Sequence, residues 1–311
     1  VGTLFAGLLA YVLARKMTSP IRMLEEGTKR IGSGDFGYRI SMETGDEFQR
    51  LANAFNQMSS QLALAQQHQQ QIERMKRFFA PQVADLIDKS RDDSVLDGRR
   101  TEVVVIFCDL RGFTAFSAET PPEEVIRVLS EYYEAVGRVV TRHEATLVNF
   151  TGDGLMVLVN APVAVSEPEL KALDITIEMQ NTVQLLITDW RTCGFNIGFG
   201  VGLASGSATV GRIGYQDRFD YTAIGSVVNL AARLCASAAD GEILLNAELA
   251  EAIGSRRAVI TRGNRRLTGI GDAVPIYSAV FAGGKPGEKT AVQRIDKRYE
   301  LCAFGAPNGD A

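Results

Sequence analysis

Histidine and cysteine are scarce in this sequence of 311 residues, which has two His and four Cys. With so few of these ligands, a structural zinc site or a histidine-based catalytic triad has almost no residues to use. Any metal site should therefore consist of oxygen ligands. No C-x-x-C pair occurs among the cysteines, and a reduced, cytosolic setting fits their scattered positions, which are Cys108, Cys193, Cys235 and Cys302.

An excess of positive charge is also missing. The net charge is −4 and the sequence pI is about 5.5. Nucleic-acid binding needs a basic face that contacts phosphates, so a nucleic-acid partner is not expected. The composition is otherwise ordinary, and the chain has room for one domain of about 180 residues with a buried core, plus smaller pieces.

The N-terminal apolar stretch falls short of the roughly 20 residues that a membrane-spanning helix requires. Residues 1–14 contain no charged side chain, and Arg15 and Lys16 follow directly. This stretch could be a core helix or the inner end of a transmembrane helix. The positive-inside rule favours the transmembrane helix, with everything after Lys16 in the cytoplasm. The sequence therefore predicts a protein of the cell inner membrane whose later domains are cytoplasmic.

Two helices are predicted after this stretch. Ser19-Pro20 is typical of a helix start with Pro in the first turn, and Gly32-Ser33-Gly34 predicts the end of that helix. A connector, 35–45, leads to a second helix that starts at Asp46-Glu47. Spacings of three and four residues favour packing of both helices against partners, and the residues with this spacing are Ile21, Leu24, Thr28, Ile31, Phe48, Leu51, Phe55, Met58 and Leu62.

Residues 15–64 resemble a HAMP domain, which is a parallel four-helix bundle formed by two chains. The resemblance is carried by two short amphipathic helices, a glycine-containing connector, Pro20 near the first helix start and Glu47 at the second. A plain coiled coil would show the same periodicity. Residues 65–100 are interpreted as a signalling helix, whose seam is interrupted by polar residues such as His68, followed by a charged linker.

A buried strand that ends on a carboxylate is predicted next. Residues 103–107 form an apolar run rich in β-branched side chains, as in a strand buried on both faces, and Asp109 follows. A carboxylate at a strand end is well placed to meet a ligand. Gly112 lets backbone amides approach an anion closely, so Gly112, Phe113 and Thr114 are predicted to cradle a triphosphate.

A second carboxylate, Asp153, lies in a predicted hairpin. Strands at 146–150 and 155–159 flank the tip Thr151-Gly152-Asp153-Gly154, whose composition could also mean only a tight turn. If the hairpin lies beside the strand that carries Asp109, the two carboxylates meet. Carboxylates together with substrate phosphates suit Mg²⁺ or Mn²⁺, and two such ions could activate an attacking hydroxyl and clamp a leaving pyrophosphate.

A helix with one apolar and one polar side is predicted at 226–239. Asn229 and Arg233 are four residues apart on the polar side and are therefore stacked on one face. An Arg on a helix face is often only solvated, but this one follows the apolar, glycine-containing stretch 221–225. Its planar, always charged guanidinium could bind a substrate phosphate.

Three segments together resemble the class III adenylate and guanylate cyclases: VVVIFCDLRGFTAFS, FTGDGLMVLV and DYTAIGSVVNLAARL. They occur in the order and spacing of that family, and the catalytic domain is predicted at 101–282. The resemblance implies an α+β fold with a ferredoxin-like βαββαβ core and additions. It also implies a head-to-tail homodimer with active sites between the subunits.

The resemblance assigns roles to individual residues. Asp109, Asp153 and the carbonyl of Leu110 would bind two Mg²⁺ or Mn²⁺ ions. Asn229 would hold the ribose, and Arg233 would stabilise charge on the α-phosphate. Because the family takes the metals from one subunit and the Asn and Arg from the other, a monomer should be inactive. The implied reaction is in-line attack of the ribose 3′-hydroxyl on the α-phosphorus, which releases a cyclic nucleotide and pyrophosphate.

The positions that read the base depart from the family pattern. Adenylate cyclases typically have Lys four residues before the second metal aspartate and guanylate cyclases usually have Glu, whereas this sequence has Asn149. The partner position is Thr222, as in many bacterial adenylate cyclases. ATP is therefore favoured, with GTP or mixed use as the alternative. The Lys that commonly binds the triphosphate is replaced by Thr268, and Arg265 or Arg266 could substitute for it.

The sequence thus predicts a membrane-anchored adenylate cyclase that makes 3′,5′-cyclic AMP in signal transduction. A regulatory pseudocyclase with little catalytic activity is the main rival, and retention of Asp109, Asp153, Asn229 and Arg233 argues against it. Residues 283–311 are polar, contain scattered Gly and Pro and show no periodic core pattern, so they are predicted to be disordered.

Overall fold

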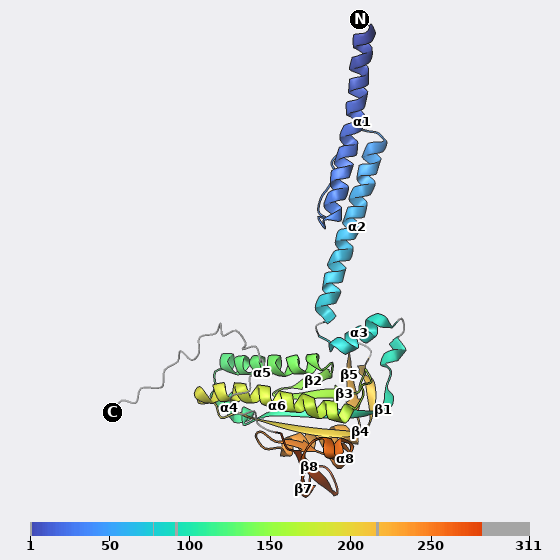
Figure 1. Cartoon of the computed structure of the whole chain (residues 1–311). Coiled ribbons are helices and arrows are strands. Elements are labelled where there is room, and N and C mark those ends of the chain that lie inside the picture. The colour runs from blue at the N-terminus through green and yellow to red at the C-terminus, as the bar shows by residue number, and fades with distance from the viewer. Residues whose placement is uncertain (1, 77, 91–92, 216–217, 282–311) are drawn as a thin grey trace, which may run out of the picture. The chain divides into compact units, whose positions relative to one another are not determined.

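The computed structural model describes residues 2–76, 78–90, 93–215 and 218–281. The chain divides into two compact units, Val1–Phe79 and Ala80–Ala311 (Figure 1). The tail that is predicted to be disordered, 283–311, lies outside the described residues.

The N-terminal unit is a pair of long helices, α1 (Gly2–Gly32) and α2 (Glu47–Lys76), joined by the connector 33–46 (Figure 1). α2 begins after Asp46, whose side chain accepts a hydrogen bond from the Phe48 backbone N–H at 3.0 Å. The prediction that a helix starts at Ser19-Pro20 is wrong, because α1 continues through Pro20. Good helix formers on both sides sustain the helix, although proline removes one backbone donor.

The connector is held against α2 by a small core and by side-chain hydrogen bonds. Ile40 of the connector is buried together with Ala52 and Phe55 of α2. The Asn56 side chain accepts a hydrogen bond from the Ile40 N–H and donates one to the Ile40 carbonyl, both at 2.8 Å. These reciprocal bonds fix an irregular segment on the surface of α2.

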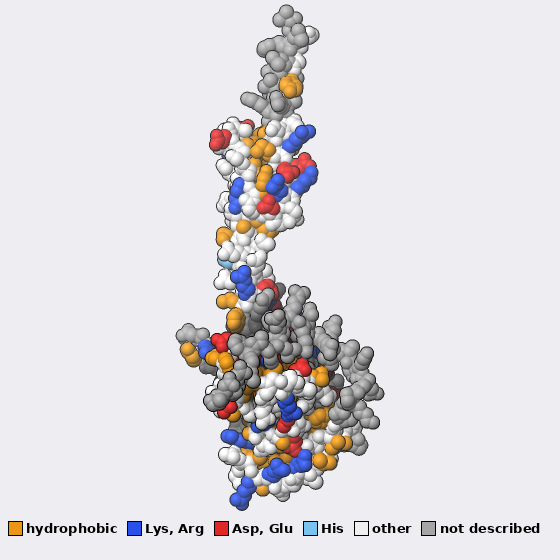
Figure 2. Space-filling view, turned by 90° about the vertical axis from the view of Figure 1, so that its left-hand side faces the viewer, with side chains coloured by type: hydrophobic (Ala, Val, Ile, Leu, Met, Phe, Trp, Pro, Cys, Tyr) orange, Lys and Arg blue, Asp and Glu red, His pale blue; other side chains and the backbone are white. Residues whose placement is uncertain are grey.

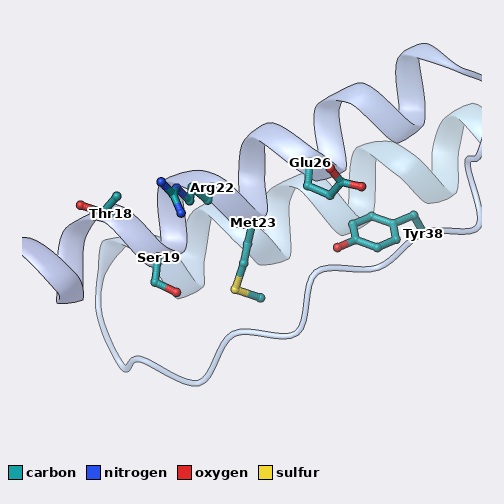
Figure 3. A pocket seen from close by; sticks show the side chains of 6 residues that line it. All are labelled: Thr18, Ser19, Arg22, Met23, Glu26 and Tyr38. Carbon is teal, nitrogen blue, oxygen red and sulfur yellow. The ribbon is translucent and has the colours of Figure 1, made fainter.

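Part of the predicted helical seam is exposed. Leu51, Met58 and Leu62 have exposed fractions of 52%, 46% and 37%, whereas Phe55 is buried. Figure 2 shows hydrophobic side chains in orange between charged ones on this unit. The unit also has a hollow of about 420 Å³ between α1 and the connector (Figure 3), lined by Thr18, Ser19, Arg22, Met23, Glu26 and Tyr38.

The apolar stretch 1–14 falls in the first half of α1. Within the part of the chain that the structure describes, no helix is both long enough and apolar enough to cross a membrane.

The C-terminal unit is built on one sheet of eight strands, in the order β2-β3-β1-β4-β6-β8-β7, with β5 paired to β4. The predicted ferredoxin-like core is confirmed. β1, α5, β2, β3, α6 and β4 follow one another along the chain, and the strand pairs β1-β3, β1-β4 and β2-β3 are antiparallel. The elements are α3 (Pro81–Lys89), η1 (Asp93–Leu96), β1 (Arg99–Arg111), α4 (Phe113–Glu119), α5 (Pro122–Arg142), β2 (Thr146–Thr151), β3 (Gly154–Val159), α6 (Pro168–Thr192), β4 (Gly198–Tyr215), β5 (Arg218–Ile224), α7 (Ser226–Ser237), β6 (Ile243–Leu245), α8 (Ala247–Ile253), η2 (Gly254–Arg256), β7 (Val259–Arg266) and β8 (Ala273–Ala279).

Helices cover both faces of this sheet, and β1 sends alternate side chains to each face. Val104, Ile106 and Cys108 belong to the apolar cluster that includes residues of α5, α6 and α8. Val103 and Val105 belong to the cluster that includes residues of α7. Figure 1 shows α5 and α6 side by side along the sheet. β1 also has a strand partner on each edge, so it is buried on all sides, as its apolar run predicts.

Glycines in β4 let α7 lie directly on the strand. An ideal Cβ at Gly202 would be 2.1 Å from the Cys235 backbone nitrogen and 2.6 Å from the Ala231 carbonyl oxygen, both in α7. At Gly206 the nearest atoms would be side-chain atoms of Val227 at 3.4 Å. The first turn of α7 is therefore beside Gly206 and its later turns are beside Gly202, so helix and strand run antiparallel.

Gly202→Ala should lower the free energy of unfolding of the C-terminal unit by about 3 kcal/mol or more, because the added methyl meets helix backbone that cannot turn aside. Gly206→Ala is the matched control and should change it by less than about 1 kcal/mol, since a side chain can adjust. Urea unfolding of the full chain measures both. Equal stabilities of the two variants would contradict the close approach of α7 to β4.

Candidate active site

Asp109 lies near the end of β1, directly beyond its buried run. Its partner in β4 is Gly200, and its side chain is 35% exposed. The neighbouring Leu110 is buried, which anchors the strand end in the core. The chain then turns at Gly112, which has φ +79 and precedes α4. The residues predicted to cradle a triphosphate, 112–114, thus begin three residues after Asp109, at the turn from strand to helix.

Asp153 lies at the tip of the β2–β3 hairpin, as predicted. Gly152 has φ +66, a left-handed conformation that favours glycine. Leu155 of β3 pairs with Cys108 of β1, so the tip lies beside the end of β1. The Tyr133 hydroxyl, on α5, donates a hydrogen bond to the Gly152 carbonyl. The hairpin tip is therefore held at both its strand and its helix side.

The two carboxylates interact. Burial, a hydrogen bond to Asp109 and the negative charge of Asp109 together raise the pKa of Asp153 from 3.8 to about 6, although the positive charge of Arg111 acts in the opposite direction. Arg111 Nη1 lies 3.8 Å from Asp109 Oδ2. Asp153 therefore holds a proton more tightly than an ordinary carboxyl group, because burial and the neighbouring negative charge disfavour its ionised form.

The donors at this point fit a hard divalent cation. Two carboxylates lie together, and Mg²⁺ commonly binds one or two carboxylates along with waters and substrate phosphates. Among the residues that the structure describes, no group of three or more His, Cys, Asp or Glu side chains could hold a metal ion.

A pocket of about 270 Å³ adjoins the carboxylates, with walls from β1, the hairpin and α7. Its α7 wall contains two alanines four residues apart, which lie on one face of the helix. These small side chains leave space above Asp109. The lining residues are Phe107, Cys108, Asp109, Thr151, Gly154, Ala232, Cys235 and Ala236.

Asn229 and Arg233 are both exposed on α7. An ideal Cβ at Gly269, in the turn between β7 and β8, would be 3.7 Å from Arg233 Nη2. In the sheet, β7 and β8 lie on the opposite side of β4 from β1. Arg233 is therefore directed away from Asp109, and one chain does not bring the two predicted halves of the site together.

Asn149 and Thr222 lie on elements that contact each other. Asn149 is exposed in β2, where the pairing with β3 shifts after Leu147. Thr222 is half-buried in β5 and pairs with Gly211 of β4. β2 and β5 are in contact although they are not paired. The two positions predicted to read the base therefore belong to one region of the unit.

Arg265 and Arg266 are exposed at the end of β7. Thr268 is exposed in the turn that follows, next to Gly269. This is the turn that Arg233 reaches. The residues that could replace the triphosphate Lys therefore lie at the turn that Arg233 reaches, whereas 112–114 follow Asp109.

Sequence reasoning missed two side chains next to the carboxylates, Arg111 and Tyr133. Arg111 is two residues after Asp109 in a strand, and the two-residue period, which puts both side chains on one face, was an available signal. No sequence signal pointed to Tyr133, because its contact with Gly152 depends on how α5 packs against the hairpin.

Asp153→Asn should stabilise the metal-free protein at pH 8 but not at pH 3. The folded protein binds a proton at Asp153 more tightly than the unfolded chain does, so the free energy of unfolding falls as pH rises from about 4 to about 6. Above this pH range the free energy of unfolding of the Asp153→Asn variant should exceed that of the wild type by about 1 kcal/mol. This difference is small because the carboxylate is partly exposed to solvent. Urea unfolding with a chelator measures it. Asp189→Asn, on exposed α6 surface, is the control, and identical pH profiles for the two variants would refute the prediction.

The chain matches known proteins in both units. Residues 96–276 match the adenylate and guanylate cyclase catalytic domain, and residues 12–63 match the HAMP domain. Adenylate cyclase 1 of Rhizobium meliloti is 30% identical over 236 residues, 74% of this chain and 33% of that protein. An uncharacterised protein of Mycobacterium tuberculosis is 29% identical over 252 residues, 80% of this chain and 44% of that protein. The chain thus spans less than half the length of these relatives.

Solved structures agree with these matches. The adenylyl cyclase CyaB from P. aeruginosa has 30% sequence identity and a TM-score of 0.58, over 60% of this chain and 97% of that chain. The guanylyl cyclase Cya2 has 34% identity and a TM-score of 0.55, over 61% and 96%. The predicted resemblance is therefore confirmed: the chain belongs to the adenylate and guanylate cyclase family, with a HAMP domain ahead of the catalytic domain.

Proposed function

We propose that the protein is an adenylate cyclase that converts ATP to 3′,5′-cyclic AMP and pyrophosphate, and that two copies of the chain form each active site. The separation of the functional residues carries this proposal. Asp109 and Asp153 lie on the β1 side of α7, whereas Arg233 extends to the β7–β8 turn. A substrate that contacts both sets needs a second chain. A twofold homodimer supplies it and creates two equivalent sites.

One chain would supply the metal half of each site. Asp109, Asp153 and the Leu110 carbonyl would hold two Mg²⁺ or Mn²⁺ ions. When bound, these ions acidify the ribose 3′-hydroxyl and neutralise charge on the pyrophosphate. The backbone amides at 112–114, which follow Asp109 at the start of α4, would receive triphosphate oxygens.

The second chain would supply the half that orients the nucleoside and the α-phosphate. Asn229 would hold the ribose so that its 3′-hydroxyl is in line with the α-phosphorus. Arg233 would donate its fork of N–H groups to the charge that develops there. Both side chains are exposed on one face of α7, as such a role across an interface requires.

The base is the least constrained part of the proposal. Asn149 and Thr222, on β2 and β5, would contact it, and Asn can donate or accept a hydrogen bond. The named adenylate cyclases among the relatives support ATP. The guanylyl cyclase Cya2, at 34% identity, supports GTP as the second candidate.

The N-terminal unit fits a role in signal input. Leu51, Met58 and Leu62 are exposed on α2, which supports pairing of HAMP domains in the same homodimer. Residues 1–14 are uncharged and precede Arg15 and Lys16, which supports attachment to the cell inner membrane with the catalytic domain in the cytoplasm.

Mixed dimers test the composite site. The full chain with Asp109→Ala and the full chain with Arg233→Ala should each be inactive with Mn²⁺ and ATP, because each homodimer lacks half of both sites. An equal mixture should recover about a quarter of the wild-type rate, since half of the randomly formed dimers are mixed and each holds one intact site. Release of cyclic AMP and pyrophosphate measures the rate.

Arg138→Ala is the control for this mixture, because Arg138 is an exposed side chain paired with Glu134 on α5, and it should keep full activity. Inactivity of the mixture beside an active wild type would mean that each chain contains a whole site. A wild type that is silent with both ATP and GTP would favour the regulatory pseudocyclase.

Asn149→Lys should raise the preference for ATP over GTP by about tenfold, measured as the ratio of the two kcat/KM values. A lysine ammonium can donate to N1 of adenine, whereas N1 of guanine carries a hydrogen. Asn149→Ala is the control and should lower both kcat/KM values without this gain. An unchanged ratio in Asn149→Lys would mean that the base is read elsewhere.

A further inference from the structure

Arg111 connects Asp109 to the end of α7. It is two residues after Asp109 in β1, and its Nη1 lies 3.8 Å from Asp109 Oδ2. Nη1 also donates to the Ala236 carbonyl at 3.5 Å, and Nη2 donates to the Cys235 carbonyl. Both carbonyls belong to the last turn of α7, and the Cys235 carbonyl also accepts a hydrogen bond from the Ala238 N–H at 3.0 Å, which caps the helix. One guanidinium therefore contacts a carboxylate of the metal half and the helix that carries the other half.

The guanidinium occupies a space that exists because position 200 is glycine. Gly200 is the β4 partner of Asp109, and an ideal Cβ there would be 2.7 Å from Arg111 Nε and 3.0 Å from Nη2. Arg111 Nε is buried and has no hydrogen-bond partner within the described ranges. An unpaired buried donor destabilises a fold. Stability alone therefore does not account for the placement of this side chain.

We propose that Arg111 is a positioning residue that couples the two active sites of the dimer. The inference rests on the proposed composite site, in which Asp109 of a chain serves one site and α7 of the same chain serves the other. Arg111 holds the Asp109 carboxylate and the C-terminal turn of α7 at the same time. A movement of α7 in one site thereby moves the metal-binding carboxylate of the other site. A movement of that carboxylate likewise moves α7.

The fork geometry of arginine is what this role requires. A guanidinium presents five N–H groups in one plane and reaches Asp109, Cys235 and Ala236 together. A lysine ammonium is a compact charge on a flexible stem, so it can pair with Asp109 but cannot also hold two carbonyls. Arg111→Lys therefore keeps the contact with Asp109 but loses the contact with the end of α7. Arg111→Met removes both contacts.

Hydrogen exchange with Mn²⁺ alone as the probe tests the connection without any activity. In the wild-type full chain, Mn²⁺ should change amide exchange in peptides that cover 232–240. In Arg111→Met this response should be lost although Mn²⁺ still binds, as electron paramagnetic resonance of free Mn²⁺ reports. Arg138→Met is the matched control and should keep the response. A response in Arg111→Met equal to that of the wild type, or no Mn²⁺ binding by the wild type, would overturn the proposal.

The mixed dimer with one intact site separates the two connections. Arg111→Met in the Arg233→Ala chain, which supplies the aspartates, should lower kcat about tenfold, and Arg111→Lys there should restore it. Arg111→Met in the Asp109→Ala chain, which supplies α7, should also lower kcat about tenfold, and Arg111→Lys there should not restore it. If Arg111→Met has no effect on kcat in one of the two chains of the mixed dimer, Arg111 serves only one site. The proposed coupling would then be refuted.

The two experiments fail for different reasons. If the wild type makes no cyclic nucleotide, the proposed function fails, and hydrogen exchange still decides whether Arg111 transmits Mn²⁺ binding to α7. If the wild type is active and the exchange response does not depend on Arg111, the coupling fails and the proposed function stands.

Discussion

The contact between the α7 backbone and β4 determines where the functional groups of the catalytic domain lie. At Gly202 the helix comes so close that a single methyl group would meet backbone atoms. With α7 held there, its alanines line a pocket together with Asp109, and Arg233 extends to the far side, toward the turn between β7 and β8. The same packing that completes the core therefore leaves the groups proposed for catalysis in two separate sets.

Charge imposes the second constraint. Burial and the neighbouring Asp109 raise the pKa of Asp153 to about 6, and the positive charge of Arg111, which also binds the end of α7, acts against this rise. A carboxylate pair in this state favours a further cation, as expected where divalent ions and a triphosphate meet. Tyr133 holds the hairpin tip in place, so the position of Asp153 also depends on α5.

Each of the two units exposes side chains that a second copy of the chain could contact. In the N-terminal unit, Leu51 and Met58 remain exposed at the spacing of a helical seam. In the C-terminal unit, Asn229 and Arg233 are exposed, and Arg233 extends away from the carboxylates of its own chain. In the proposed homodimer, the HAMP and cyclase domains would link helix pairing to assembly of the active sites.

The local sequence determined the strand that ends on Asp109, the Gly-Asp-Gly hairpin and the α7 helix with Asn229 and Arg233, because each has its own periodicity or turn chemistry. It misplaced the first helix start, since Ser19-Pro20 also fits inside a continuous helix. Only the tertiary structure could show that Tyr133 binds the hairpin tip, that Arg111 binds the end of α7 and that Arg233 extends to the turn between β7 and β8. Those relations join residues far apart in the chain, and they depend on how closely helix and sheet pack, which no local pattern encodes.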